Sequence, residues 1–419
     1  QGHPHYLVFE LGYTGHFPHY ITHLAKFWCE REVTGKLSII ISPQFAQHHA
    51  EVLAVGKSAQ PERLQFVVLS ETDVSRLAPR RSPLQRAKRS LQEWRLLRQY
   101  TQRLGATHCL LLYFDSFQTA VMLGRPLSCA FSGIYFRPTL HYSTFSEYVP
   151  NRRDKIQTWR ERVTLPLILR HPQLRNIFCL DPLFVDFAQN KMRSSASQYL
   201  PDPVELTSTQ SEDEVLDFKR QLGIESGRTT FLLFGALYDR RKGVAKVLEA
   251  ISQLPPKACQ KICLLLVGQL GDHQASSLRS RIDGLTKARP LQVIVRDSFV
   301  PDSEVALCFQ GSDIVLAPYQ RHVGMSGILV HAAAAQKPLI ASNYGLLGEI
   351  VRRYQLGIAV DSTVPEDIAQ AIQGCLDVSL ETLGNRQKMV AFAQRNSAEK
   401  FAELIFQTLG RSEADVQGA

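Results

Sequence analysis

Strand-like apolar runs alternate with helical patterns along nearly the whole chain, and this alternation constrains the fold more than any other feature of the sequence. The apolar runs span residues 5–11, 36–42, 64–69, 107–114, 176–181, 229–237, 261–270, 291–297, 313–319, 337–343 and 356–360. Strands that alternate with helices form parallel sheets covered by helices on both faces. The pattern predicts an α/β protein with doubly wound sheets, which bind ligands at the carboxyl ends of their strands.

The chain has 419 residues, a length that suits two domains of about 200 residues each. A stretch rich in proline, serine and acidic residues lies between the two halves and is typical of an interdomain linker. We predict an N-terminal domain over residues 1–200, a linker over 201–228, a C-terminal domain over 229–395, and a C-terminal helix and tail over 396–419. The two domains are expected to face each other across a cleft.

The composition is that of an ordinary soluble globular protein, with 44% hydrophobic and 21% charged residues. No apolar run approaches the roughly 20 residues that a spanning helix needs, and the first residues lack the features of a secretory signal. The eight cysteines are scattered, mostly through apolar segments. Core packing in a reducing compartment explains them better than a zinc site does, so we expect a cytoplasmic protein.

The segment from Asp313 to Ile350 reads as a strand, a loop of small residues, a helix and a second strand. The loop contains His322, Gly324, Ser326 and Gly327 directly before the alanine-rich helix. Where a strand feeds a helix through small residues, unpaired backbone N–H groups and the positive helix end face a common point. This segment predicts a site for a diphosphate, with Ser326 both as the N-cap and as a hydroxyl donor to phosphate.

A second candidate lies between Gly235 and Gly243, after the first strand of the second half. Its cations are Arg240, Arg241 and Lys242, and a helix begins directly after them. A helix start is an unfavourable place for cations because the helix dipole repels them. This misfit favours a function, namely neutralising a diphosphate leaving group, over a solvated basic loop.

In the first half, Gly15 and His16 follow the first strand, and Asp115 follows the fourth. These positions point toward the expected cleft, so His16 and Asp115 are candidate substrate contacts. A plain turn histidine and an aspartate that caps a helix are the alternatives. His16, His19 and His23 share helical spacing, but no carboxylate accompanies them, and we expect no metal site.

Residues 76–103 carry nine basic residues and one acid. From Leu84 onward, apolar residues recur at a helical period, with Trp94 among them and arginines around them. Such a helix either lies on anionic lipid, with Trp94 at the interface, or packs into the core with a solvated cationic face. A second basic stretch spans residues 152–175. Nucleic acid is a less favoured partner because neither stretch resembles a nucleic-acid-binding module.

The second half resembles the glycosyltransferases of the two-Rossmann (GT-B) architecture, and most of all family 4. Residues 235–243 resemble the family's G-R-L-x-x-x-K-G element, residues 299–319 its helix and strand before the donor site, and residues 331–351 its E-A-M-A-x-G-x-P-V element and G-G-x-x-E turn. The resemblance is best over residues 229–360. In the first half only Gly15 and His16 and the segment FCLDPLF fit the pattern.

This resemblance implies that a sugar moves from a nucleoside diphosphate to an acceptor hydroxyl with retention of configuration and without an essential metal. Lys242 stands at the family's lysine, but Ala236 replaces the expected arginine, so Arg240 or Arg241 would supply that charge. The family's two glutamates, seven residues apart, fall at Val323 and His331.

His331 would then contact the ribose, and His322 the sugar. Glu349 keeps its place in the glycine turn. We expect a hexosyltransferase that serves polysaccharide or glycolipid synthesis, with a glycan or glycolipid acceptor and a peripheral location at the inner face of a membrane. The alternatives are a catalytically silent GT-B protein that binds a nucleotide or glycan as a partner of active transferases, and a nucleotide-sugar 2-epimerase.

Overall fold

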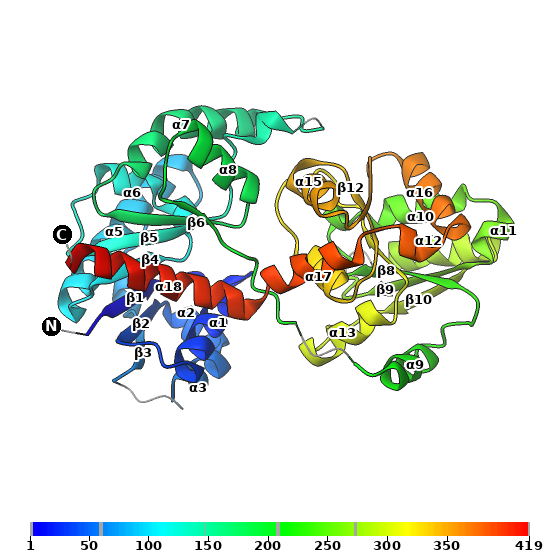
Figure 1. The fold of residues 1–419 in the computed structure, drawn as a ribbon, viewed down its shortest axis with the longest axis horizontal. Helices are drawn as coiled ribbons and strands as arrows, with labels where there is room; N and C mark the ends of the chain where they lie inside the picture. The colour runs from blue at the N-terminus through cyan, green and yellow to red at the C-terminus, as the bar shows by residue number, and fades with distance from the viewer. Residues whose placement is uncertain (1–2, 58–61, 146, 207–209, 272–274, 418–419) are drawn as a thin grey trace. The chain divides into compact units, whose positions relative to one another are not determined.

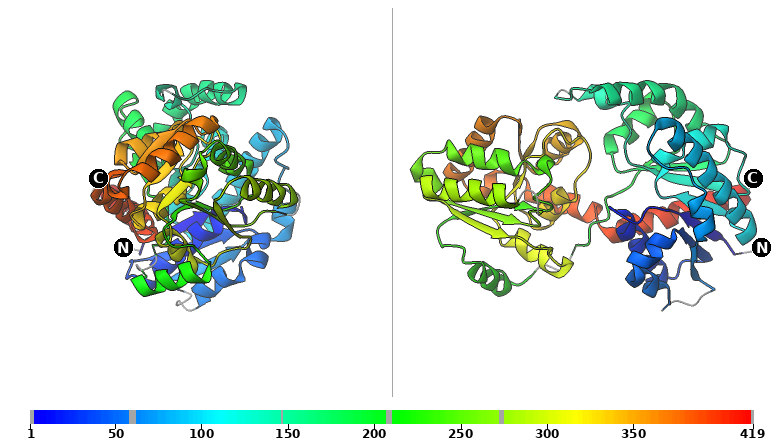
Figure 2. Two further views of the ribbon diagram at one scale, coloured as in Figure 1. Left: turned by 90° about the vertical axis from the view of Figure 1, so that its right-hand side faces the viewer. Right: turned by 180° about the vertical axis from the view of Figure 1, so that it is seen from behind.

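The computed structural model describes residues 3–57, 62–145, 147–206, 210–271 and 275–417. The chain divides into two compact units. The first unit comprises Gln1–Ser143, Pro150–Pro203 and Ala398–Ala419, and the second comprises Thr144–Val149 and Val204–Ser397. In each unit, helices cover both faces of a central sheet (Figures 1 and 2).

The first unit contains a seven-stranded sheet in the order β3-β2-β1-β4-β5-β6-β7. Its strands, which all pair in parallel, are β1 (His5–Phe9), β2 (Lys36–Ile41), β3 (Leu64–Val68), β4 (His108–Leu111), β5 (Ala130–Tyr135), β6 (Leu174–Cys179) and β7 (Ser197–Tyr199). The order reverses between β1 and β4, which makes their carboxyl ends a topological switch point. The sequence predicted five of these strands and missed β5 and β7.

The helices of the first unit pack on both faces of this sheet. They are α1 (Phe17–Glu30), α2 (Pro43–His48), α3 (Ala50–Lys57), α4 (Glu71–Ser75), α5 (Pro83–Leu104), α6 (Gln118–Leu123), α7 (Arg152–Leu169), α8 (Pro182–Lys191) and α18 (Ala398–Gln417), with the 3₁₀ helix η1 (Phe114–Ser116). A second 3₁₀ helix, η2 (Tyr142–Thr144), spans the point at Ser143 where the first stretch of this unit ends. Because side chains alternate along a strand, Leu7 and Phe9 of β1 enter one core and Tyr6 and Val8 the other. The C-terminal helix α18 packs into the second of these cores through Phe401.

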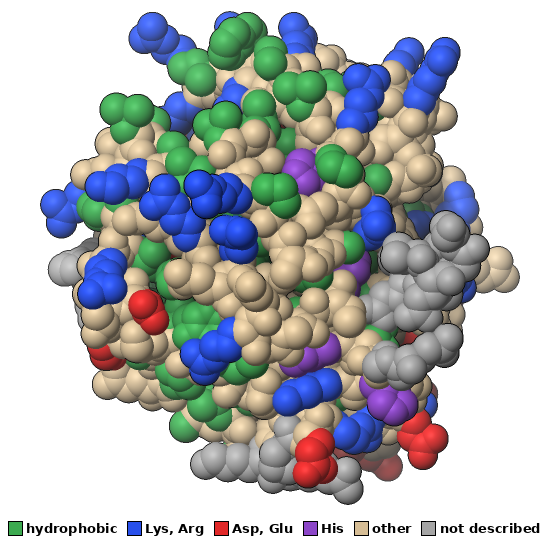
Figure 3. Space-filling model, turned by 90° about the vertical axis from the view of Figure 1, so that its left-hand side faces the viewer, with side chains coloured by type: hydrophobic (Ala, Val, Ile, Leu, Met, Phe, Trp, Pro, Cys, Tyr) green, Lys and Arg blue, Asp and Glu red, His purple; other side chains and the backbone are tan. Residues whose placement is uncertain are grey.

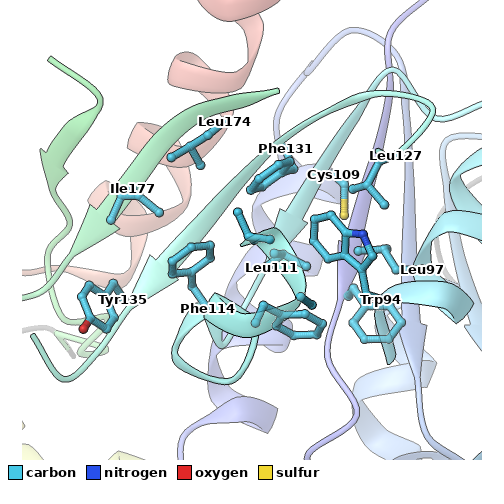
Figure 4. Packing of buried hydrophobic residues seen from close by; sticks show 14 of the residues in the cluster. Trp94, Leu97, Cys109, Leu111, Phe114, Leu127, Phe131, Tyr135, Leu174 and Ile177 are labelled. Carbon is cyan, nitrogen blue, oxygen red and sulfur yellow. The ribbon is translucent and has the colours of Figure 1, made fainter. Parts of the chain in front are cut away.

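The basic helix predicted from the sequence is α5, and its apolar side faces the protein core. Trp94 is only 2% exposed and donates a 2.8 Å hydrogen bond from Nε1 to the carbonyl of Arg125. Figure 4 shows Trp94 beside Leu97 and Cys109. The alternative that placed Trp94 at a lipid interface is therefore wrong, because the indole is already buried and hydrogen-bonded.

The second unit contains a six-stranded parallel sheet in the order β10-β9-β8-β11-β12-β13. All six strands were predicted: β8 (Thr229–Phe234), β9 (Ile262–Val267), β10 (Gln292–Arg296), β11 (Ile314–Ala317), β12 (Leu339–Ser342) and β13 (Gly357–Val360). The helices are α9 (Glu212–Gln221), α10 (Val244–Ser252), α11 (Pro256–Cys259), α12 (Ala275–Ala288), α13 (Asp302–Gln310), α14 (Gly327–Ala334), α15 (Gly345–Tyr354), α16 (Pro365–Asp377) and α17 (Arg386–Arg395), with η3 (Arg240–Lys242) and η4 (Leu380–Thr382). Here the strand order reverses between β8 and β11.

The predicted linker over residues 201–228 contains a helix and joins the second unit from Val204 onward. The helix is α9, which begins with a capping box in which the Ser211 and Glu214 side chains accept hydrogen bonds from each other's backbone N–H. The serine and acidic residues that suggested a linker are thus the cap of a helix.

Among the residues that the structure describes, no helix is long and apolar enough to cross a membrane. All eight cysteines are free thiols, and all but Cys29 are buried.

Candidate functional site

The candidate site lies at the topological switch point of the second unit, where β8 and β11 end. Gly235 follows β8 with a φ of 115°, and Gly268 follows β9 with a φ of 132°. A Cβ on Gly268 would come within 1.9 Å of the Gly235 carbonyl oxygen, so only glycine fits there. Glycines at strand ends thus let two backbones approach each other at the edge where α/β sheets bind ligands.

Lys242 connects this edge to the end of β11. Its Nζ donates a 2.6 Å hydrogen bond to the Tyr319 hydroxyl and lies 4.5 Å from the centre of the tyrosine ring. The Tyr319 hydroxyl in turn lies 3.0 Å from Ser326 Oγ. A chain of three side chains therefore joins the β8 loop, the end of β11 and the start of α14.

The backbone around these side chains is held by further contacts. Gly243 has a φ of 74°, and a Cβ there would come 2.3 Å from the Pro318 carbonyl oxygen. The Gln320 N–H donates to the Arg241 carbonyl at 2.7 Å. The Ser362 hydroxyl donates to the Tyr319 carbonyl at 2.8 Å, so the loop after β13 also supports Tyr319.

Ser326 occupies the N-cap position of α14 as predicted, but its side chain makes no hydrogen bond to the helix backbone. Its hydroxyl is directed to Tyr319 instead. The first N–H groups of α14, beginning with Gly327, therefore have no side-chain cap. Such a helix start attracts an anion through its backbone donors and its dipole.

The loop that carries His322 and Gly324 packs on the start of α15. Gly345 has a φ of 63°, and a Cβ there would come 2.8 Å from Val323 Cα. The Leu346 N–H donates to the Val323 carbonyl at 2.9 Å. His322 lies edge-on to Tyr319, and its Nε2 is 3.3 Å from the Met325 carbonyl oxygen.

The two arginines before Lys242 differ in their surroundings. Arg241 is paired with Asp239 at 2.6 Å, and its hydrogen bonds hold the pKa of that carboxyl below the usual value. Arg240 is exposed and forms no ion pair with a carboxylate among the described residues. Arg240 is thus the freer of the two cations.

Two residues that the sequence predicted to contact the sugar donor have other partners in the second unit. The His331 ring stacks on Phe309 with 5.1 Å between ring centres, and Glu349 forms an ion pair with Arg352. The predicted residues that the structure brings together are thus Gly235, Lys242, Ser326 and Gly327.

In the first unit, Gly15, His16 and Asp115 gather at the switch point of β1 and β4. The His16 ring packs against the rings of Phe17 and Phe136, with centres 4.4 and 4.5 Å away, while the rest of the residue is exposed. The N–H groups of Phe136 and Arg137 donate to the Asp115 carboxyl group at 2.9 and 3.0 Å. Desolvation and the charge of Arg137 lower the pKa of His16 to about 4, and desolvation raises the pKa of Asp115 to about 7. His16 is therefore neutral at pH 7, and Asp115 braces the end of β5.

In the part of the chain that the structure describes, no three histidine, cysteine or carboxylate side chains are grouped so that they could hold a metal ion. The residue that sequence reasoning missed is Tyr319. Its signal in the sequence is its position as the last residue of the apolar run 313–319.

Comparison with known proteins finds similarity in the same part of the chain, the second unit. Residues 228–377 match the family model described as glycosyl transferases group 1. The chain is 29% identical over 189 residues to a D-inositol 3-phosphate glycosyltransferase of Rhodococcus jostii. The aligned region covers 44% of this chain and 39% of that protein. It is 28% identical over 193 residues to a phosphatidyl-myo-inositol mannosyltransferase of Mycobacterium tuberculosis, covering 45% of this chain and 48% of that protein. The chain thus spans about half, or less, of the length of the relatives it matches.

The fold matches over almost the whole chain. The crystal structure of Anabaena HepE in complex with UDP and glucose aligns with a TM-score of 0.65 at 15% identity, covering 97% of this chain and 100% of that one. The predicted α/β fold with two parallel sheets is confirmed as that of GT-B glycosyltransferase structures. The resemblance to glycosyl transferases group 1 is confirmed for residues 228–377.

Proposed function

We propose that the chain is a hexosyltransferase that moves a sugar from a nucleoside diphosphate sugar to an acceptor hydroxyl, with retention of configuration and without an essential metal. The observation that carries this proposal is the chain Lys242–Tyr319–Ser326 at the uncapped start of α14. A cation and backbone N–H groups converge there, and a diphosphate leaving group requires both. The match of residues 228–377 to a glycosyltransferase family supports it.

The proposed reaction breaks the bond between the anomeric carbon and the diphosphate oxygen and forms a bond from that carbon to the acceptor oxygen on the same face. Negative charge develops on the leaving diphosphate, and Lys242 with the first amides of α14 stabilises it. The acceptor proton passes to an oxygen of the departing phosphate. Lys242 thus acts on the leaving group, and Tyr319 is a positioning residue that holds the lysine and Ser326 in place.

The donor and acceptor classes rest on relatives. HepE was crystallised with UDP and glucose, so UDP-glucose is the first donor to test. Two relatives are named for transfer to an inositol phosphate and to phosphatidylinositol, so a hydroxyl of a glycan or of a phosphate-bearing lipid is the proposed acceptor. We place the protein in the cytoplasm at the inner face of a membrane, with a role in polysaccharide or glycolipid synthesis.

A second candidate is a catalytically silent protein that binds a nucleotide or glycan. This candidate is favoured because the chain lacks glutamates at the two positions where the resembled family has them. Val323 at the first position is uncharged, and the His331 ring at the second is stacked on Phe309. Neither residue carries the negative charge of a carboxylate.

Incubation of the full chain with UDP- and GDP-sugars distinguishes the two candidates. Release of nucleoside diphosphate that depends on an acceptor supports the transferase, whereas a thermal shift without release supports the silent protein. Proton NMR of the product tests retention, and addition of a chelator tests metal independence. No thermal shift and no release with any donor would reject both.

A further inference from the structure

The outer face of α7 carries a row of exposed apolar side chains, which we call the α7 ridge. The ridge consists of Ile156, Trp159, Val163 and Leu167, which are 67%, 70%, 54% and 54% exposed. Their spacing of three and four residues places them on one face of the helix. The opposite face is fixed in the protein by Glu161, which accepts hydrogen bonds from Tyr135 and from the backbone of Thr139 at 2.7 and 2.8 Å. The ridge therefore points away from the core.

Cations flank the α7 ridge on both sides. By helical position, Arg153 and Arg160 lie on one side, and Lys155 and Arg162 lie on the other; all four are exposed. The two acidic residues of α7 do not neutralise these cations on the outer face. Glu161 is buried, and the Asp154 side chain accepts a hydrogen bond in the N-terminal capping box. In Figure 3, hydrophobic side chains gather along the top of the molecule, where α7 lies in Figure 1, with Lys and Arg side chains around them and acidic ones in the lower half.

A pocket of about 580 Å³ opens beside α7, between α5, α6 and α7. Four arginines line it, namely Arg80, Arg86, Arg89 and Arg160, against two carboxyl residues, Glu93 and Asp115. Arg80 and Arg89 are paired with the buried Glu93 at 3.2 and 2.6 Å. No carboxylate pairs with Arg86 or Arg160 within the described residues. Met122 and Leu123 add exposed apolar surface to the same pocket.

The pocket also contains polar atoms that lack a partner. Ser90 Oγ, Gln118 Oε1 and Thr164 Oγ1 line it and have no hydrogen-bond partner in the described part of the chain. Ser90 is 3% exposed and Gln118 is 5% exposed. Buried polar atoms normally find partners, so these atoms can bond to a polar ligand or to water in the pocket.

We propose that the first unit docks on an anionic lipid bilayer through the α7 ridge, and that the pocket receives the phosphate-bearing headgroup of a lipid. The ridge is one helix wide and has cations on both sides, as in helices that lie in a membrane interface. Arg86 and Arg160 supply charge for the phosphate, and Ser90 and Gln118 supply hydrogen bonds to its oxygens and hydroxyls. The headgroup in the pocket deepens the proposed acceptor, a phosphate-bearing lipid, and in that part it rests on the proposed function. Docking itself requires no turnover, so it is tested without it.

Trp159 provides a direct readout because the chain has three tryptophans and the other two, Trp28 and Trp94, are buried. We expect vesicles of phosphatidylcholine with phosphatidylglycerol to shift the emission of Trp159 to the blue and to pellet the full chain, more weakly at high salt. Vesicles of phosphatidylcholine alone should do neither. An equal response to both vesicle types would overturn the electrostatic part of the proposal.

Matched variants separate the ridge from the pocket. The pair Ile156→Ser and Val163→Ser should weaken pelleting at least tenfold, whereas Leu216→Ser and Phe299→Ser, at exposed apolar residues of the second unit, should leave it unchanged. The pair Arg86→Gln and Arg160→Gln should weaken it about tenfold. Arg95→Gln and Arg98→Gln, on exposed parts of α5, should change it less than twofold.

The proposal fails if the ridge variant, with an unchanged thermal midpoint, pellets like the parent. It also fails if the parent ignores vesicles but forms a dimer that the ridge variant cannot form, because the ridge would then be an interface between copies. Loss of binding in the Arg95 and Arg98 variant, with normal binding in the pocket variant, would contradict the pocket as the headgroup site. The headgroup would then bind to the exposed face of α5.

Discussion

The Nζ atom of Lys242 and the hydroxyl of Tyr319 lie 2.6 Å apart, although 77 residues separate them in the sequence. The contact joins the loops after β8 and β11, the two strands between which the sheet order reverses. The same hydroxyl reaches Ser326 at the start of α14. Tyr319 thus sets the position of the cation relative to the helix start that would bind an anion.

Tyr319→Phe should lower kcat about tenfold and leave the protein folded. The ring stays in place, and the lost hydroxyl removes one hydrogen bond to a charged group, a contact that contributes about 1.5 kcal/mol. Steady-state kinetics with a saturating donor measure the change. Tyr354→Phe, at a tyrosine of the same unit that packs on Phe392, is the control and should keep the parent rate. An unchanged kcat in Tyr319→Phe would remove its positioning role.

Gly268→Ala should destabilise the second unit by roughly 3 kcal/mol or more, because the new Cβ would meet the Gly235 carbonyl and φ is positive. Gly284→Ala in α12 is the matched control. Nothing lies within 4 Å of a Cβ there, so alanine should stabilise the helix by up to about 1 kcal/mol. Urea unfolding of both variants tests the pair, and equal effects would contradict the close approach of the two strand ends.

Glu10→Gln should make the first unit more stable at high pH. Burial raises the pKa of Glu10 to about 8, so the folded protein holds this proton where the unfolded chain releases it. The stabilisation is fully present below the ordinary pKa of 4.5 and is lost as pH rises through about 8. The difference between variant and parent should thus grow by roughly 4 kcal/mol between about pH 5 and about pH 9.

Urea unfolding across this pH range measures that difference. Glu32→Gln, at an exposed glutamate, is the control, and its difference from the parent should stay flat. A flat difference for Glu10→Gln as well would show that Glu10 is ionised in the folded protein.

Trp94→Ala should destabilise the first unit by roughly 3–5 kcal/mol, since the indole is buried and hydrogen-bonded. Leu84→Ala, on the same helix, should change stability by less than about 0.5 kcal/mol because Leu84 is 83% exposed. Thermal unfolding compares the two. A small loss in Trp94→Ala would restore the lipid-interface interpretation of α5.

The fold could be predicted from the sequence because buried parallel strands are continuous apolar runs. All six strands of the second unit were predicted for this reason. The strand β5 was missed because Ser132 and Gly133 interrupt its pattern; Gly133 is needed there since a Cβ would come 2.5 Å from the Phe114 ring. The strand β7 was missed because it has only three residues.

The candidate site could be predicted only in part. A glycine and a cation after a strand end predicted Gly235 and Lys242, and a loop of small residues before a helix predicted Ser326. Tyr319 was missed because a tyrosine at the end of an apolar run looks like a core residue, and its role depends on Lys242, which is 77 residues away in the sequence. The partners of His331 and Glu349 depend on helix packing, which a motif does not specify.

The central claim is that Lys242 and the start of α14 hold the diphosphate of the donor. The most direct test is the rate of nucleoside diphosphate release by Lys242→Ala, with Lys246→Ala as the control, since Lys246 is already paired with Glu249 at 3.2 Å. We predict a loss of about a hundredfold, or about 3 kcal/mol, in Lys242→Ala and the parent rate in the control. Release by Lys242→Ala at the parent rate would contradict the account.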